Sequence, residues 1–203
     1  MISPDGILIT NHHCCFSRVK HHSTVEKNYV ADGFWAASRD KELPNPGLTV
    51  AFLIRMEEVT GTALKGLNDS IPEQERNSII YRNLSDIQKK ATEGNGYNSE
   101  VKSFYFGTRY FLFVYEVFKD VRLVGAPPLS IGKFGGDTDN WIWPRHTGDF
   151  SLFRIYANRD NKPAEYSPDN VPYKPAKYLP LSVDGVKDGD FTMVIGYPGR
   201  TDE

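Results

Sequence analysis

A run of aromatic and β-branched residues between Val101 and Val124 limits the possible fold of this chain more than any other feature. Its aromatic side chains include Phe104, Phe106, Tyr110, Phe111, Phe113, Tyr115 and Phe118. Residues of this kind favour strands, and the Gly107-Thr108-Arg109 segment is typical of a turn. The run therefore predicts two strands joined by that turn. A helix over residues 110–119 is the alternative, because a short apolar run fits either structure.

Further strands are predicted on both sides of this run. Residues 48–59 and 150–156 alternate between side chains that would face opposite sides of a sheet. Shorter apolar segments with the same character lie at residues 7–10, 179–183 and 191–195. A chain with this many short strands is expected to be mostly β.

One helix is predicted, from Ser70 to about residue 93. Ser70 and Glu73 have the spacing of a capping box, which would satisfy free N–H groups at the start of the helix. Apolar residues then recur at helical spacing and define one buried face: Ile80, Leu84, Ile87 and Ala91. Gly94-Asn95-Gly96 is expected to end the helix.

The composition excludes two classes of partner. Lys and Arg total 24 against 26 Asp and Glu, so the formal net charge is −2, and no basic block is present. Nucleic acid is therefore not an expected partner. The longest apolar stretch, at residues 110–115, is far shorter than the roughly 20 residues of a membrane-spanning helix.

Both ends of the chain are abrupt, and we expect a fragment of a longer protein.

A candidate general base follows the first predicted strand, in the segment Thr10-Asn11-His12-His13-Cys14. The strand is expected to lead into a turn that holds an imidazole in a cleft, and a general base needs such immobility. The plainer interpretation is a pair of surface histidines beside a core cysteine. A zinc site that adds His21 and His22 is a further alternative, but the spacing of the histidines is not that of known zinc sites.

A candidate orienting carboxylate, Asp149, lies directly before the strand at residues 150–156. At that place it could accept a hydrogen bond from Nδ1–H of a histidine and fix the tautomer of the ring. The alternative is an ordinary Gly-Asp turn before a strand.

Cys14 and Cys15 are the only cysteines, and neighbouring cysteines almost never bridge to each other because the geometry is strained. Either both are free thiols, or one has its partner outside the chain.

The segment from Phe134 to His146 is rich in glycine, aspartate and tryptophan. Its polar residues could bind a cation or an amine, whereas its tryptophans could be core anchors. A calcium loop is the alternative, although the ligand positions of an EF-hand are not filled.

Taken together, several segments resemble the S46 family of bacterial dipeptidyl peptidases. They are residues 2–6, 8–14, 28–29, 32–36, 42–50, 134–149, 189–194 and 196–201. The resemblance implies a chymotrypsin-like double β-barrel with a large inserted helical domain, and the removal of dipeptides from free amino termini of oligopeptides. It also implies a homodimer in full-length form, a periplasmic, secreted or outer-membrane-associated location in a bacterium, and no metal or cofactor.

Carried over by position, the resemblance assigns four residues. His13 resembles the general base, and Asp149 resembles its orienting carboxylate. Asn140 resembles the residue that binds the α-amine of the substrate, with Trp141 beside it. The family's serine, oxyanion hole and specificity residue lie downstream of this chain, and its partner cysteine lies before Met1.

The resemblance also predicts the domain organisation. Residues 1–177 are expected to hold the first barrel, with a helical insertion near 60–93, and residues 178–203 the opening strands of the second. Without its serine the isolated chain is expected to be inactive. Two rival hypotheses are a catalytically inactive domain that only binds peptides and a β-rich metal-binding protein.

Overall fold

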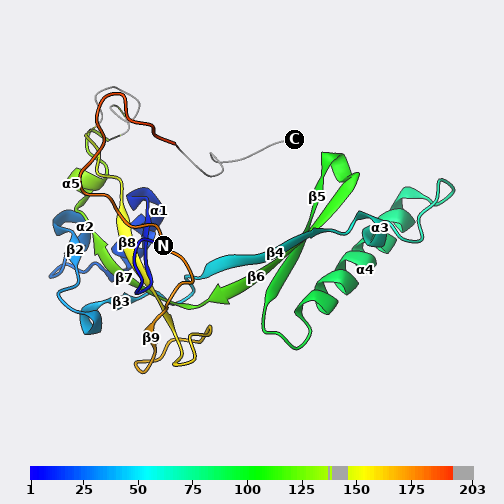
Figure 1. The fold of residues 1–203 in the computed structure, drawn as a ribbon, viewed down its shortest axis with the longest axis horizontal. Helices are drawn as coiled ribbons and strands as arrows, with labels where there is room; N and C mark the ends of the chain where they lie inside the picture. The colour runs from blue at the N-terminus through cyan, green and yellow to red at the C-terminus, as the bar shows by residue number, and fades with distance from the viewer. Residues whose placement is uncertain (137, 139–145, 194–203) are drawn as a thin grey trace. The chain divides into compact units, whose positions relative to one another are not determined.

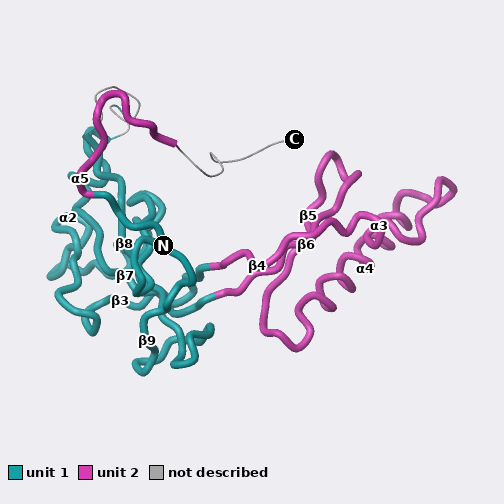
Figure 2. Tube along the Cα trace, viewed as in Figure 1, with its two compact units in different colours: residues 1–50, 118–182 teal, residues 51–117, 183–203 magenta. Residues whose placement is uncertain are grey.

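The computed structural model describes residues 1–136, 138 and 146–193. The chain forms two compact units (Figure 2). The first comprises Met1–Val50 and Phe118–Ser182, and the second comprises Ala51–Val117 and Val183–Glu203. Each unit is built around its own antiparallel sheet.

In the first unit, the described residues form a six-stranded sheet around two long central strands, β7 (Asp120–Ala126) and β8 (Ser151–Ala157) (Figure 1). The shorter strands are β1 (Ile7–Thr10), β2 (Phe34–Trp35), β3 (Leu43–Pro44) and β9 (Val171–Pro172). The order is β1-β8-β7-β2, with β3 paired to β7 and β9 paired to β8. Six of the seven residues of β8 are buried, because neighbouring strands pair with both of its edges and side chains cover both of its faces.

Helix α1 (His12–His22) follows β1 directly and packs on this sheet. The predicted turn at residues 11–13 is therefore wrong, since the helix begins at His12. Cys15 and Val19, one helical turn apart, are buried against Val121 and Leu123 of β7. Most residues of this segment are polar, so its narrow apolar stripe is hard to recognise in the sequence. The burial of that stripe against the sheet stabilises the helix. The short helices of this unit are α2 (Tyr29–Asp32), η1 (Arg39–Lys41) and α5 (Leu129–Gly132).

The second unit contains a three-stranded sheet with helix α4 (Glu73–Thr92) on one face. Its strands are β4 (Val50–Glu58), β5 (Asn98–Phe104) and β6 (Arg109–Phe118), in the order β4-β6-β5, and its short helices are α3 (Thr60–Ala63) and η2 (Tyr105–Gly107). The two strands predicted on either side of the turn are confirmed as β5 and β6, and the alternative helix over residues 110–119 is wrong. The end of the aromatic run differs from the prediction, because residues 120–124 belong to β7 of the first unit. Alternate residues of β6 are buried under α4, which a helix could not have produced.

The predicted helix is confirmed, but its start differs from the prediction. Ile87 and Ala91 are buried, and Ile80 and Leu84 pack against the same cluster. The helix begins at Glu73 after Pro72, and no side chain caps it. The expected capping box is not formed. The N–H of Ser70 instead donates to Asn68 Oδ1 at 2.9 Å, so Ser70 belongs to the preceding turn.

The mostly β fold is confirmed, and two finer expectations have different outcomes. Within the described residues the sheet of the first unit is open, with β1 and β2 at its ends, so its closure into a barrel stays a prediction. The expected strand at residues 179–183 is not formed, and Leu179, Leu181 and Val183 are exposed. A strand needs a neighbouring strand to pair its backbone groups, and such pairing is not seen for this segment in the described structure, although Leu179 N–H donates to the carbonyl of Met1. The division at residue 178 stays a prediction.

In the described part of the chain, no helix is long and apolar enough to cross a membrane.

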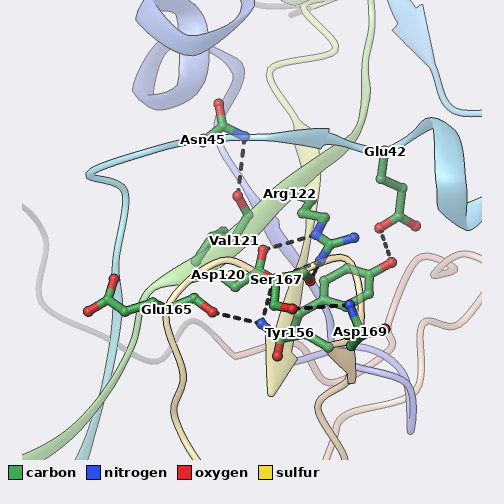
Figure 3. Close-up of polar contacts among 10 residues, drawn as sticks. Glu42, Asn45, Asp120, Val121, Arg122, Tyr156, Glu165, Ser167 and Asp169 are labelled. Atoms are coloured by element: carbon green, nitrogen blue, oxygen red, sulfur yellow. Dashed lines mark hydrogen bonds and ion pairs between the residues drawn. The ribbon is translucent and has the colours of Figure 1, made fainter. Parts of the chain in front are cut away.

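A buried polar network holds the connection between β8 and β9 against β7 (Figure 3). Arg122 donates through Nε and Nη2 to the two oxygens of Asp120, at 2.9 and 2.7 Å. Its guanidinium also lies 3.7 Å from the ring centroid of Tyr156 and donates to the carbonyl of Ser167. Asn170 Nδ2 donates to Asp120 Oδ2 at 2.9 Å. The carboxylate of Asp120 is thus the acceptor that joins the sheet to the connection.

A second buried carboxylate, Glu42, lies beside this network. It accepts hydrogen bonds from Arg154 Nε at 2.9 Å and from the Tyr156 hydroxyl at 2.8 Å. Burial and the bond to Glu42 raise the pKa of Tyr156 to about 12. The tyrosine therefore stays a neutral donor at all ordinary pH values, and each buried carboxylate of the sheet has a guanidinium partner.

We predict that Asp120→Ala lowers the free energy of unfolding by about 3–5 kcal/mol, because it leaves the buried Arg122 guanidinium without its charged partner. Asp160→Ala, in an exposed turn, is the matched control and should unfold like the wild type. Urea unfolding of the three proteins measures the difference. Equal stability of both variants would show that the pair adds no net stabilisation.

Candidate active site

The pairing of β1 with β8 brings the two predicted catalytic side chains together. The register places Thr10 opposite Ser151. His13 lies just beyond the end of β1, at the second position of α1, and Asp149 lies just before the start of β8. Residues 136 apart in the chain are therefore neighbours at one end of the sheet.

The two side chains form a close pair. His13 Nδ1 lies 2.7 Å from Asp149 Oδ2, and the backbone N–H of His13 donates to Asp149 Oδ1 at 3.0 Å. The side chain of His13 is 69% exposed and that of Asp149 is 24% exposed. The carboxylate is thus held on the protein side of the ring, while Nε2, on the opposite edge of the ring, is directed away from the carboxylate. This is the arrangement that a general base and its orienting carboxylate require.

Several hydrogen bonds determine the charge state of Asp149. Burial by itself raises its pKa, but the backbone N–H of His13, its imidazole and the Asn11 amide all favour the ionised form. Their combined effect holds the pKa of Asp149 below its usual value of 3.8. The carboxylate is therefore ionised at neutral pH and can stabilise a protonated His13.

His12 has a different environment, although it is the neighbour of His13. It is buried, and its ring lies against Gly132 of α5, where an added Cβ would come within 2.5 Å of the ring. The two histidines therefore point to different places, and only His13 contacts Asp149. Among the described residues, no group of three His, Cys, Asp or Glu side chains could hold a metal ion, so the zinc alternative finds no support there.

The two cysteines lie on α1 directly after the histidine. Both are free thiols; Cys14 is exposed and Cys15 is buried. Cys15 Sγ donates to Ser151 Oγ at 2.7 Å, and burial raises the pKa of the Cys15 thiol. Ser151 is itself fully buried and donates to the carbonyl of Phe150, so it is not available as a nucleophile beside His13.

Asn140 and Trp141 lie outside the described residues, and their role at the substrate amine stays a prediction. The described residues on either side of their segment are joined by hydrogen bonds. Gly148, next to Asp149, donates its N–H to the carbonyl of Ile131, and Thr147 donates its hydroxyl to the carbonyl of Phe134. Phe134 and Thr147 are therefore held together, and Thr147 lies two residues before Asp149.

One residue of the site escaped the sequence reasoning. Asn11 donates from Nδ2 to Asp149 Oδ2 at 3.2 Å. Asparagine is a preferred residue at the start of a helix, so a prediction of α1 would have drawn attention to it. Because the segment was expected to be a turn, that signal was missed.

Comparisons with known proteins identify the family of this chain. The model of the family described as Peptidase S46 matches residues 1–203. The Asp/Glu-specific dipeptidyl-peptidase of Capnocytophaga gingivalis is 56% identical over all of this chain and 28% of its own length. The dipeptidyl-peptidase 7 of the same organism is 52% identical over 99% of this chain and 28% of its own length. The crystal structure of Porphyromonas endodontalis DPP11 in complex with the dipeptide Arg-Glu is 46% identical and superimposes with a TM-score of 0.80, over 94% of this chain and 28% of that one. The chain therefore spans between a quarter and a third of the length of these relatives.

We predict that Asp149→Asn destabilises the fold at neutral pH by about 1 kcal/mol, through weaker acceptance of the charged hydrogen bonds. Since the folded-state pKa of Asp149 is depressed, its contribution is present above 3.8 and is lost as the pH falls through the folded-state value. The difference between wild type and variant in urea unfolding should therefore shrink between pH 6 and pH 2.5. A difference that is the same at both pH values would contradict the depressed pKa.

Proposed function

Because this chain belongs to the peptidase S46 family, we propose that it supplies the general base and the orienting carboxylate of a serine-type dipeptidyl peptidase. The observation that carries the proposal is the 2.7 Å contact between His13 Nδ1 and Asp149 Oδ2. A histidine whose Nδ1 is bound by an ionised carboxylate keeps Nε2 unprotonated and ready to accept a proton.

In the proposed mechanism, His13 Nε2 takes the proton of a serine hydroxyl as that oxygen attacks the scissile carbonyl. The imidazolium so formed is stabilised by Asp149, and it then gives the proton to the leaving amine. We place the serine and the oxyanion hole in a part of the protein outside residues 1–203. The exposed position of the His13 ring supports this arrangement, because a hydroxyl from another part of the protein can reach it.

The proposed substrates are oligopeptides with a free amino terminus. The relatives are named as dipeptidyl peptidases, and one solved relative holds the dipeptide Arg-Glu. We propose that the side-chain oxygen of Asn140 accepts a hydrogen bond from the substrate ammonium, with Trp141 as a wall beside it. Extended chain covers about 3.3–3.6 Å per residue, so an amine pocket roughly 7–10 Å from the nucleophile would measure two residues.

A homodimeric assembly and a periplasmic, secreted or outer-membrane-associated location are further proposals that rest on the resemblance alone. Neither is needed for the chemistry assigned to His13 and Asp149.

A chimera tests the catalytic roles. Residues 1–203 would replace the matching segment of the C. gingivalis Asp/Glu-specific dipeptidyl-peptidase, to which they are 56% identical. We expect the chimera to cleave fluorogenic dipeptide substrates, and we expect His13→Ala and Asp149→Asn to lower kcat on the order of 10⁴-fold or more. His21→Ala, an exposed histidine at the end of the same helix, is the matched control and should leave kcat unchanged.

The isolated chain is expected to show no turnover, because it lacks the nucleophile and the oxyanion hole. An active His13→Ala chimera would refute the assignment of the general base. Turnover by residues 1–203 alone would reveal a nucleophile inside this chain.

The amine anchor is tested in the same chimera. We predict that Asn140→Ala lowers kcat/KM for free-amino substrates about 100-fold, the cost of losing a charge-assisted hydrogen bond in a closed site. Substrates with a blocked amino terminus should be poor for the unmodified chimera. Asn68→Ala, in an exposed turn, should behave like the parent. Equal cleavage of blocked and free substrates would rule out the amine-anchor role.

A further inference from the structure

The start of helix α1 is capped by a residue from elsewhere in the chain. An asparagine before a helix normally accepts a hydrogen bond from the N–H of the second or third helical residue. Asn11 stands at this position, but its side chain makes no such bond. The N–H of His13, the second residue of the helix, donates instead to Asp149 Oδ1 at 3.0 Å. The carboxylate that binds the His13 ring is therefore also the cap of the helix that carries it.

The side chain of Asn11 is turned towards Asp149 instead. Its Nδ2 donates to Asp149 Oδ2 at 3.2 Å and to the backbone carbonyl of Asp149 at 3.3 Å. Both partners are acceptors only, so the nitrogen of the amide, and not its oxygen, faces them. The two protons of one NH₂ group thus tie the side chain and the backbone of Asp149 together.

Both oxygens of the Asp149 carboxylate accept hydrogen bonds. Oδ1 accepts from the His13 N–H, while Oδ2 accepts from His13 Nδ1 and from Asn11. Rotation of the carboxyl group would break all three side-chain contacts at once. Without Asn11, the carboxyl group could turn at the cost of fewer bonds, since only His13 would hold it, and the side chain of His13 is itself largely exposed.

We infer that Asn11 is a positioning residue, whose amide holds the Asp149 carboxylate with Oδ2 on Nδ1 of His13. The inference rests on the proposed function for its catalytic meaning, since it deepens the roles assigned to that pair. Asn11 itself lies one residue beyond β1, and the pairing of Thr10 with Ser151 keeps it close to Asp149, which lies two residues before Ser151. The hydrogen bonds found for the Asn11 side chain go to Asp149, and none goes to the His13 ring.

The test measures the His13 ring without any need for turnover. Nuclear magnetic resonance of the chain, labelled with ¹⁵N-histidine and ¹³C-aspartate, reports the tautomer of His13 and the titration of Asp149. His13→Gln assigns the histidine signals. Asn11→Ala removes the donor, and Asn11→Ser removes the amide but keeps a residue that caps helices well. Asn28→Ala is the matched control, since Asn28 caps α2 by accepting from Ala31 N–H and does not contact the pair.

In the wild type we expect His13 to be mainly the Nδ1–H tautomer, with a slowly exchanging Nδ1 proton. In Asn11→Ala and Asn11→Ser alike, the ratio of the Nδ1–H to the Nε2–H tautomer should fall about tenfold, as one charge-assisted hydrogen bond is lost. The pKa of Asp149 should rise in both variants. Asn28→Ala should leave both readouts at their wild-type values.

Three outcomes would overturn the inference. Unchanged tautomer and titration in both Asn11 variants would show that the amide does not hold the carboxylate. A wild-type result in Asn11→Ser, with a loss in Asn11→Ala, would show that Asn11 acts through helix capping. An equal loss in Asn28→Ala would show a general effect of instability. An inactive chimera would contradict the proposed function and leave this test of Asn11 intact.

Discussion

The antiparallel pairing of β1 with β8 is the constraint on which the candidate site depends. It brings together segments 136 residues apart, and such long-range closure costs chain entropy that local contacts cannot recover. The burial of β8 between its neighbours, with Phe153 and Ile155 almost fully covered, offsets that cost. The register then decides which side chains meet at the end of the sheet, because a slip by one residue would turn Asp149 to the opposite face.

At that end of the sheet, one carboxylate serves two purposes. Asp149 accepts the N–H of His13 as the cap of α1 and binds Nδ1 of the same residue. The positive end of the helix macrodipole favours an ionised group there, as do the hydrogen-bond donors around it. The backbone and the ring of His13 are thereby fixed by the same partner, so the imidazole is positioned although it is largely exposed.

The buried charges of the first unit follow a different logic from those of the site. Asp120 and Glu42 are almost inaccessible, and each is bound by a guanidinium, from Arg122 and Arg154. Unpaired charges at such positions would cost several kcal/mol, so these pairs and the hydrogen bonds around them are satisfied as a set. The network fastens the connection after β8 to β7 (Figure 3), whereas the side chain of His13 is largely exposed.

The sequence by itself determined the elements whose patterns are local. Aromatic and β-branched residues on both sides of a turn predicted the strands of the aromatic run, helical spacing predicted α4, and a Gly-Asp step before a strand indicated Asp149. Helix α1 and its capping by Asp149 are seen only in the tertiary structure, because the narrow apolar stripe of this mostly polar helix is recognised only once the sheet that covers it is known. The strand expected at residues 179–183 is not formed, because no neighbouring strand pairs with it in the described structure. Periodicity states which face a segment could bury, but a partner that satisfies its backbone and covers that face decides whether it forms.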